Sequence, residues 1–253
     1  MTIGFLYRFA PSLKMVLKTK KGRRFIMKKT IKNFIVSSTF ILSFAVWTVL
    51  LTRVGLDKIG PDGSKVGFAK INSAFHTFTG VNMTLYNITD WLGLVPIFLC
   101  LVFAILGLVQ WIKRKSILKV DYSILVLGGF YLLVIATYIL FEYIVINYRP
   151  ILINGYLEVS YPSSTTMLVM CVVPTAVMQF NSRIKNKILK LIVNAMLTAF
   201  AIFMVTARLV SGVHWLTDII GGALISSGLV TLYYAVDSIK HNKKSTHRSE
   251  CSK

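Results

Sequence analysis

Acidic residues are scarce in this chain. Its 253 residues include 9 Asp and Glu against 29 Lys and Arg, so the formal net charge is +20. Charged residues make up 15% of the sequence and hydrophobic residues 55%, whereas a soluble domain carries about 25% charged residues. With a mean hydropathy of +0.67, this composition excludes an ordinary soluble domain and indicates a protein with several membrane spans.

Cysteine is scarce as well. Cys100 and Cys171 lie inside apolar runs, and Cys251 lies in the polar C-terminal tail. No pair suggests a disulfide framework, and no cluster of His, Cys or carboxylate residues has the spacing of metal ligands. We therefore expect neither a metal nor another cofactor.

Most hydrophobic residues are gathered in six long runs. We predict an all-α, polytopic fold with six transmembrane helices, at 34–51, 91–112, 122–146, 167–180, 188–205 and 215–236. The fourth of these helices can begin as early as Ser163. A mixed stretch at 71–85 has apolar residues at loose helical spacing, and there we predict a helix that lies on the outer membrane surface.

The basic residues lie mainly in alternate connections between these runs. Segments assigned to the inner side hold 23 of the 29 Lys and Arg, and the outer segments hold six. This bias predicts a cytoplasmic-membrane protein with both termini in the cytoplasm. It also makes anionic lipids at the cytoplasmic face, rather than nucleic acid, the expected partner of the basic clusters.

Three parts follow from this arrangement: a basic arm at 1–32, a six-span membrane domain at 33–236 and a basic tail at 237–253. Part of the arm has an alternative explanation, because Met27 with the lysines after it also looks like a natural start. No oligomeric state follows from the sequence.

The stretch between the last two runs gathers Arg208, His214 and Asp218, and ionisable groups at membrane depth are functional candidates. Asp218 follows His214 by four residues, so a helix starting at Trp215 would let the carboxylate hold one imidazole nitrogen. Arg208 can clamp an oxyanion with its planar fork. Together they suit phosphoryl transfer through a phosphohistidine. The alternative is structural, with Arg and His anchoring a span and Asp capping a helix.

The predicted topology brings Arg149 and the segment 162–165 to the same outer face as these residues. The whole set resembles the type 2 phosphatidic acid phosphatase superfamily, the membrane lipid-phosphate phosphatases related to acid phosphatases and vanadium haloperoxidases. The third motif of that family is Ser-Arg, five residues, His, three residues and Asp. Arg208, His214 and Asp218 match it, with Ala207 in place of the Ser.

The other two motifs are degenerate. The first, Lys, six residues and Arg-Pro, is matched by Arg149-Pro150, but Glu142 stands at the Lys position. The second, Pro-Ser-Gly-His, reads Pro162-Ser163-Ser164-Thr165, so its Gly and His are absent. The resemblance spans roughly 92–236 and implies a helical core like that of the acid phosphatases and haloperoxidases.

The resemblance also implies roles for the matched residues. His214 is then the nucleophile, Asp218 orients it, and Arg149 and Arg208 bind the phosphate. Further phosphate contacts are expected from Ser163, Ser164 and Thr165.

The family's general acid has no equivalent here, because the hydroxyl of Thr165 does not give up a proton at neutral pH. Glu142 is a candidate proton donor, or an ion-pair partner of Arg149 or Arg208. His76 is a second candidate donor if its segment folds over the site.

A missing acid matters most when the leaving group is an alkoxide. We therefore predict hydrolysis of a polyprenyl diphosphate, such as the undecaprenyl carrier of bacterial wall synthesis, in preference to phosphatidate. The alternative is a catalytically impaired homologue that binds, senses or transports phosphate-bearing lipids.

Overall fold

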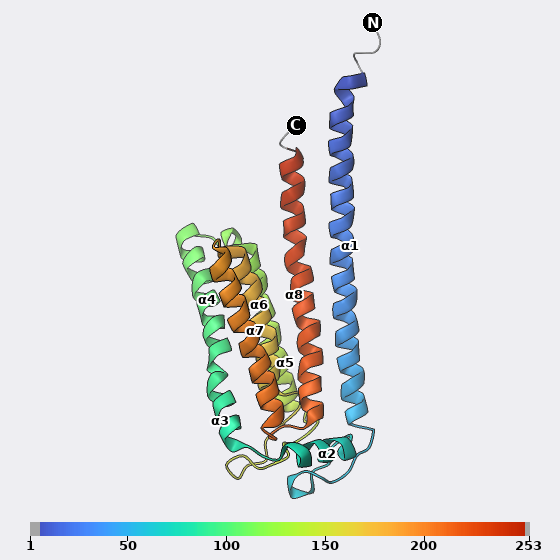
Figure 1. The fold of residues 1–253 in the computed structure, drawn as a ribbon, viewed down its shortest axis with the longest axis vertical. Coiled ribbons are helices and arrows are strands. Elements are labelled where there is room, and N and C mark those ends of the chain that lie inside the picture. The colour runs from blue at the N-terminus through green and yellow to red at the C-terminus, as the bar shows by residue number, and fades with distance from the viewer. Residues whose placement is uncertain (1–5, 251–253) are drawn as a thin grey trace.

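The computed structural model describes residues 6–250, and the surroundings of side chains for 28–239. Within that range the chain forms eight α-helices, two short 3₁₀ turns and no β-strand, which confirms the all-α class (Figure 1). The α-helices are α1 (Leu6–Leu51), α2 (Ala69–Thr79), α3 (Met83–Leu92), α4 (Leu94–Arg114), α5 (Tyr122–Tyr143), α6 (Ser164–Arg183), α7 (Lys187–Val210) and α8 (Leu216–Glu250).

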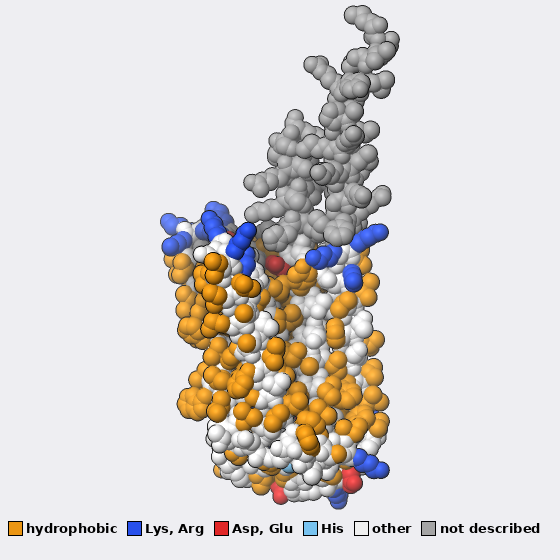
Figure 2. Space-filling view, viewed as in Figure 1, with side chains coloured by type: hydrophobic (Ala, Val, Ile, Leu, Met, Phe, Trp, Pro, Cys, Tyr) orange, Lys and Arg blue, Asp and Glu red, His pale blue; other side chains and the backbone are white. Residues whose placement is uncertain are grey.

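Six helical segments among the described residues are long and apolar enough to cross a membrane, at Lys28–Leu51, Met83–Arg114, Tyr122–Tyr143, Ser164–Arg183, Lys187–Val210 and Leu216–Ile239. Figure 2 shows a broad hydrophobic surface on the visible face of the bundle, with Lys and Arg collected at its two ends. An exposed apolar surface of this extent faces lipid rather than water. The chain is thus a multi-pass membrane protein with the predicted six spans.

The terminal helices extend beyond the membrane segments. The predicted basic arm continues α1 from Leu6, and the predicted tail continues α8 as far as Glu250. Residues 1–5 of the arm and 251–253 of the tail lie outside the described range.

The surface helix predicted at 71–85 is broken in two. Gly80 adopts a positive φ of 62° and ends α2, and the Asn82 side chain accepts a hydrogen bond from the Leu85 N–H to cap α3. Only α2 lies across the ends of the spans (Figure 1). The second span therefore begins at Met83 rather than at 91.

Close packing of α8 fixes the connection that follows α5. A Cβ on Gly221 would lie 2.4 Å from the ring of Tyr161, so only glycine allows this approach. The Tyr161 ring also stacks on Phe44 of α1 at 6.0 Å, and its hydroxyl lies 2.7 Å from that of Thr48. The connection between α5 and α6 is thereby held against α1 and α8 at the end of the bundle where α2 lies.

Candidate active site

A short ribbon, in which two extended segments are joined by a single β-bridge, carries half of the site. Between α5 and α6 the chain folds back on itself, with an antiparallel bridge between Tyr148 and Val159. On either side of the bridge, the Arg149 N–H donates to the Glu158 carbonyl oxygen at 3.0 Å, and the Ser160 N–H donates to the Asn147 carbonyl oxygen at 2.9 Å. Side chains alternate along extended segments, so the residues on either side of the bridge share one face. That face carries four polar side chains: Asn147, Arg149, Glu158 and Ser160.

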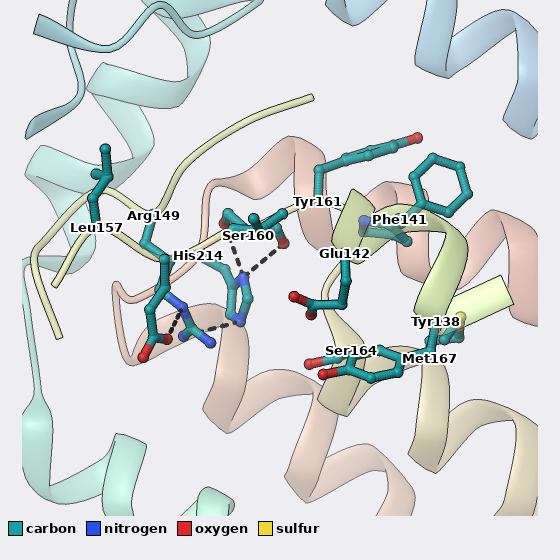
Figure 3. A pocket seen from close by; sticks show the side chains of 13 residues that line it. Tyr138, Phe141, Glu142, Arg149, Leu157, Ser160, Tyr161, Ser164, Met167 and His214 are labelled. Atoms are coloured by element: carbon teal, nitrogen blue, oxygen red, sulfur yellow. Dashed lines mark hydrogen bonds and ion pairs between the residues drawn. The ribbon is translucent and has the colours of Figure 1, made fainter. Parts of the chain in front are cut away.

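His214 lies opposite this face, in the loop between α7 and α8, and is buried. Its Nδ1 lies 3.1 Å from the Ser160 hydroxyl and 3.2 Å from the Ser160 carbonyl oxygen. A carbonyl oxygen only accepts hydrogen bonds, so the network assigns the ring proton to Nδ1. The lone pair then lies on Nε2, 3.4 Å from Nη1 of Arg149 (Figure 3).

Asp218 is buried in the first turn of α8 and accepts three hydrogen bonds. Asn147 donates to Oδ1 at 3.0 Å, the Trp215 N–H donates to Oδ2 at 3.0 Å, and the Ser160 hydroxyl also donates to Oδ2. The distance from Oδ2 to Nδ1 of His214 is 3.9 Å, which is too long for a hydrogen bond.

The predicted direct contact, in which the Asp218 carboxylate holds one imidazole nitrogen of His214, is therefore corrected. Helical spacing does bring the two residues together, but the Ser160 hydroxyl lies between them. It donates to the carboxylate and accepts from Nδ1–H. Ser160 thus relays the orienting effect of the carboxylate to the imidazole.

Burial, together with the guanidinium charges of Arg149 and Arg208, holds the pKa of His214 well below its ordinary value. The imidazole is consequently neutral at neutral pH. A neutral ring with an oriented Nδ1–H and a free Nε2 lone pair can act as a nucleophile.

The two predicted phosphate ligands are held by different partners. Arg149 pairs through Nε with Glu158 at 3.0 Å, without the alignment of a hydrogen bond. Arg208 is fully buried; its Nη1 donates to the Thr89 hydroxyl at 3.1 Å, and its Nη2 lies 3.5 Å from a carboxylate oxygen of Asp90. Arg208 is thus anchored to α3.

A cavity of about 480 Å³ opens beside His214. Its walls come from the end of α5, the ribbon, the start of α6 and the His214 loop (Figure 3). The polar side chains that line it are Tyr138, Glu142, Arg149, Glu158, Ser160, Tyr161, Ser164 and His214, and Arg208 is not among them. The guanidinium, the imidazole and the hydroxyl groups can bind an oxyanion, and the carboxylates of Glu142 and Glu158 line the same cavity.

The comparison with protein families agrees with this arrangement. Residues 127–241 match the model of the PAP2 superfamily. Over these residues the chain is similar to that superfamily. The match covers Arg149, His214 and Asp218, and it confirms the recognition drawn from the motifs.

A solved structure shares the fold. It is described as the first transmembrane PAP2-type phosphatidylglycerolphosphate phosphatase from Bacillus subtilis, and it superposes with a TM-score of 0.54 at 20% identity. The similarity covers 80% of this chain and 96% of that one. No curated protein matches the chain.

The three hydroxyl residues at the second PAP2 motif have different places. Only Ser164 lines the cavity. Ser163 is fully buried, and its hydroxyl accepts the Thr166 N–H at 3.5 Å to cap α6. Thr165 faces an adjoining apolar groove. The predicted phosphate contacts of the Ser163 and Thr165 side chains are therefore corrected, because the start of α6 turns both away from the cavity.

Glu142 occupies the cavity but does not pair with Arg149 or Arg208. Those arginines pair with Glu158 and Asp90, which the ribbon and α3 bring closer. The ion-pair role predicted for Glu142 is thus corrected, and Glu142 instead lines the cavity wall together with Tyr138 (Figure 3).

His76 of α2 is also placed away from the chemistry. Its Nε2 lies 3.1 Å from the carbonyl oxygen of Gly212, and its ring packs against Trp215 at 5.5 Å. It does not line the cavity. His76 braces the His214 loop, and the donor role considered for it is not supported.

Sequence reasoning missed four residues of the site. Asn147, Glu158 and Ser160 lie on the ribbon, and Tyr86 of α3 contacts both arginines. For the ribbon residues there was a signal. Polar residues alternate at 147 and 149 and again at 158 and 160, a period that is typical of extended segments. No comparable pattern marks Tyr86.

Proposed function

We propose that the chain hydrolyses a membrane lipid phosphate through a phosphohistidine at His214. One observation carries the proposal. A buried, neutral imidazole is fixed through Nδ1 by Ser160, while its Nε2 lies beside Arg149 at a polar cavity. A pocket that merely binds a headgroup has no need of an oriented nucleophile.

An apolar groove beside the cavity supports a lipid as the substrate. The groove has a volume of about 350 Å³ and is lined mostly by side chains of α4, α5 and α6. It shares Tyr138, Ser164 and Met167 with the cavity. A phosphate bound near His214 would therefore place the first carbons of its lipid chain in a hydrophobic setting.

The favoured substrate is a polyprenyl diphosphate such as undecaprenyl diphosphate. In the first step, the Nε2 lone pair forms a bond to the terminal phosphorus, and the phosphorus–oxygen bond to the lipid monophosphate breaks. In the second step, water attacks the phosphorus, the nitrogen–phosphorus bond breaks, and the protons of the water leave with inorganic phosphate. With a fully ionised diphosphate, charge balances in both steps without an external proton.

A lipid phosphomonoester poses a harder problem, because its leaving alkoxide needs a proton. General acid catalysis is worth about 10²–10⁴-fold, and Thr165 stands where the family has its histidine. We propose that, for a monoester, a protonated Glu142 gives this proton to the leaving alkoxide and that its carboxylate regains a proton from the water that attacks the phosphohistidine in the second step. The position of Glu142 on the cavity wall, close to Tyr138 and Ser164, supports that role.

The orientation in the membrane is part of the proposal. Of the 29 Lys and Arg, 23 lie in the arm, the tail and the connections assigned to the inner side. The start of α1 and the end of α8 lie at one end of the molecule, and the ribbon lies at the other (Figure 1). We infer a cytoplasmic membrane, an outward-facing cavity, cytoplasmic termini and anionic lipids at the basic face.

The test is phosphate release in detergent from undecaprenyl diphosphate, phosphatidate and phosphatidylglycerolphosphate, the lipid named for the Bacillus subtilis neighbour. We expect release from the diphosphate and its loss in His214→Ala. Activity that survives in His214→Ala overturns the proposal. If the wild type releases no phosphate but still binds these lipids, the chain is a binding, sensing or transport protein.

A further inference from the structure

Tyr86 of α3 lies close to both of the arginines that the PAP2 motifs assign to the phosphate. The Cζ atom of Arg208 is 4.6 Å from the centre of the Tyr86 ring, and that of Arg149 is 5.8 Å from it. The carbonyl oxygen of Tyr86 also accepts a hydrogen bond from Nη1 of Arg208 at 3.4 Å. No other aromatic ring in the described part of the chain contacts both guanidinium groups.

Such a ring reduces the electrostatic repulsion between the two guanidinium groups. Two guanidinium groups that must grip one phosphate repel each other while the site is empty, and both are largely buried here. The negative face of an aromatic ring attracts a cation, and burial strengthens that attraction. One ring in contact with both cations therefore offsets their repulsion and limits where each can move.

Arg208 also retains hydrogen-bonding capacity. Among the described residues its buried Nε has no hydrogen-bond partner, whereas the Nε of Arg149 is ion-paired with Glu158 at 3.0 Å. Glu142 replaces the lysine of the first motif, so the motifs leave these two cations to attract the phosphate; Arg149 lines the cavity, and Arg208 lies outside its lining. Their relative placement consequently matters more than it would with a third cation present.

We propose that Tyr86 is a positioning residue that holds Arg149 and Arg208 at the spacing needed to bind one phosphate group. The ring face, and not the hydroxyl, performs this task. The inference rests on the proposed function for its biological meaning, but phosphate binding tests it even in a protein that does not turn over.

The experiment compares Tyr86→Leu, Tyr86→Phe and Tyr86→Trp with the wild type, each purified in detergent. The first readout is the dissociation constant of inorganic phosphate from calorimetry, and the second is KM against kcat for phosphate release. Tyr156→Leu is the matched control, because Tyr156 is an exposed tyrosine on the connection between α5 and α6.

We expect Tyr86→Leu to weaken phosphate binding about five- to thirty-fold and to raise KM more than it lowers kcat. Phe and Trp should restore binding to within about two-fold of the wild type, and Tyr156→Leu should leave it unchanged. Rescue by a ring separates positioning from a general loss of packing.

Three results would overturn the inference: no phosphate binding by the wild type, wild-type binding by Tyr86→Leu, or equal losses in the Leu and Phe variants. If Tyr86→Leu does not fold, the Phe and Trp variants still decide, because weak phosphate binding by both would exclude the ring-face role. Phosphate binding without hydrolysis in the wild type would refute the proposed function and leave this inference standing.

Discussion

Ser160→Ala removes the hydroxyl that joins Asp218 to His214. The Ser160 carbonyl oxygen remains 3.2 Å from Nδ1, so the ring keeps its tautomer. What is lost is the hydrogen-bonded link to the carboxylate, which stabilises the imidazole as positive charge develops on it. Hydrogen bonds to charged groups contribute about 1.5–3 kcal/mol. At 1.36 kcal/mol per factor of ten, we expect kcat for phosphate release to fall about 10- to 150-fold.

The assay compares Ser160→Ala, Asp218→Asn and the double variant, with Ser238→Ala as the control. Ser238 loses a hydroxyl that donates to Tyr234 in the far part of α8, so its activity should be unchanged. In a relay the two site substitutions act on one interaction, and the double variant should be little worse than the more damaging single one. A Ser160→Ala enzyme within two-fold of the wild type, or fully additive losses, would refute the relay.

Four further predictions follow from the same geometry. The pKa of His214 is lowered by burial and by the nearby guanidinium groups, so attack by the neutral ring should persist below pH 6.5, and the acid limb of kcat/KM should lie under that value. The same shift makes folding less favourable as pH falls below about 6.5, because the unfolded chain then binds a proton that the native site excludes. The melting temperature, measured from pH 7.5 to 5, should therefore fall with pH, and the slope of melting temperature against pH should be smaller in His214→Gln. Glu142→Gln should slow phosphatidate hydrolysis at least ten-fold while diphosphate hydrolysis stays within about three-fold, and equal losses on both substrates would contradict the donor role. Glu158→Gln frees Arg149 from a half-exposed ion pair, so inorganic phosphate should inhibit up to about five-fold more strongly; weaker inhibition would show that Glu158 helps to place the guanidinium.

Much of the architecture could be predicted because it depends on patterns of hydrophobic and basic residues that are visible in the sequence alone. Six apolar runs and the alternation of basic connections specify six spans, whatever the details of packing. The prediction of a single helix at 71–85 was wrong for a local reason. Gly80 adopts a left-handed conformation and the next helix starts almost at once, while apolar spacing alone is insensitive to such a break.

The site was predictable where a motif fixes the spacing. Arg149, His214 and Asp218 come together because motif order and topology bring them to the same end of the bundle. The Ser160 relay was not predictable in this way, since it depends on the register of the ribbon. A shift of that register by one residue would turn the hydroxyl of Ser160 to the opposite face.

The contacts made by α3 could not be predicted, for a different reason. Tyr86 and Asp90 lie between the predicted surface helix at 71–85 and the predicted span at 91–112, where no pattern marks a site. Which α3 side chain meets Arg208 depends on how α3 packs against α7. That packing is a tertiary property, and no local signal in the sequence encodes it.

The most direct test of the central claim is to look for phosphate on His214. Purified protein would be mixed with undecaprenyl diphosphate that carries radioactive label in its terminal phosphate, quenched within one turnover and treated with acid or base. We predict a protein-bound label that is stable to base, labile to acid and absent from His214→Ala. Hydrolysis by the wild type without any such label, or a label that persists in His214→Ala, would contradict a phosphohistidine at this site.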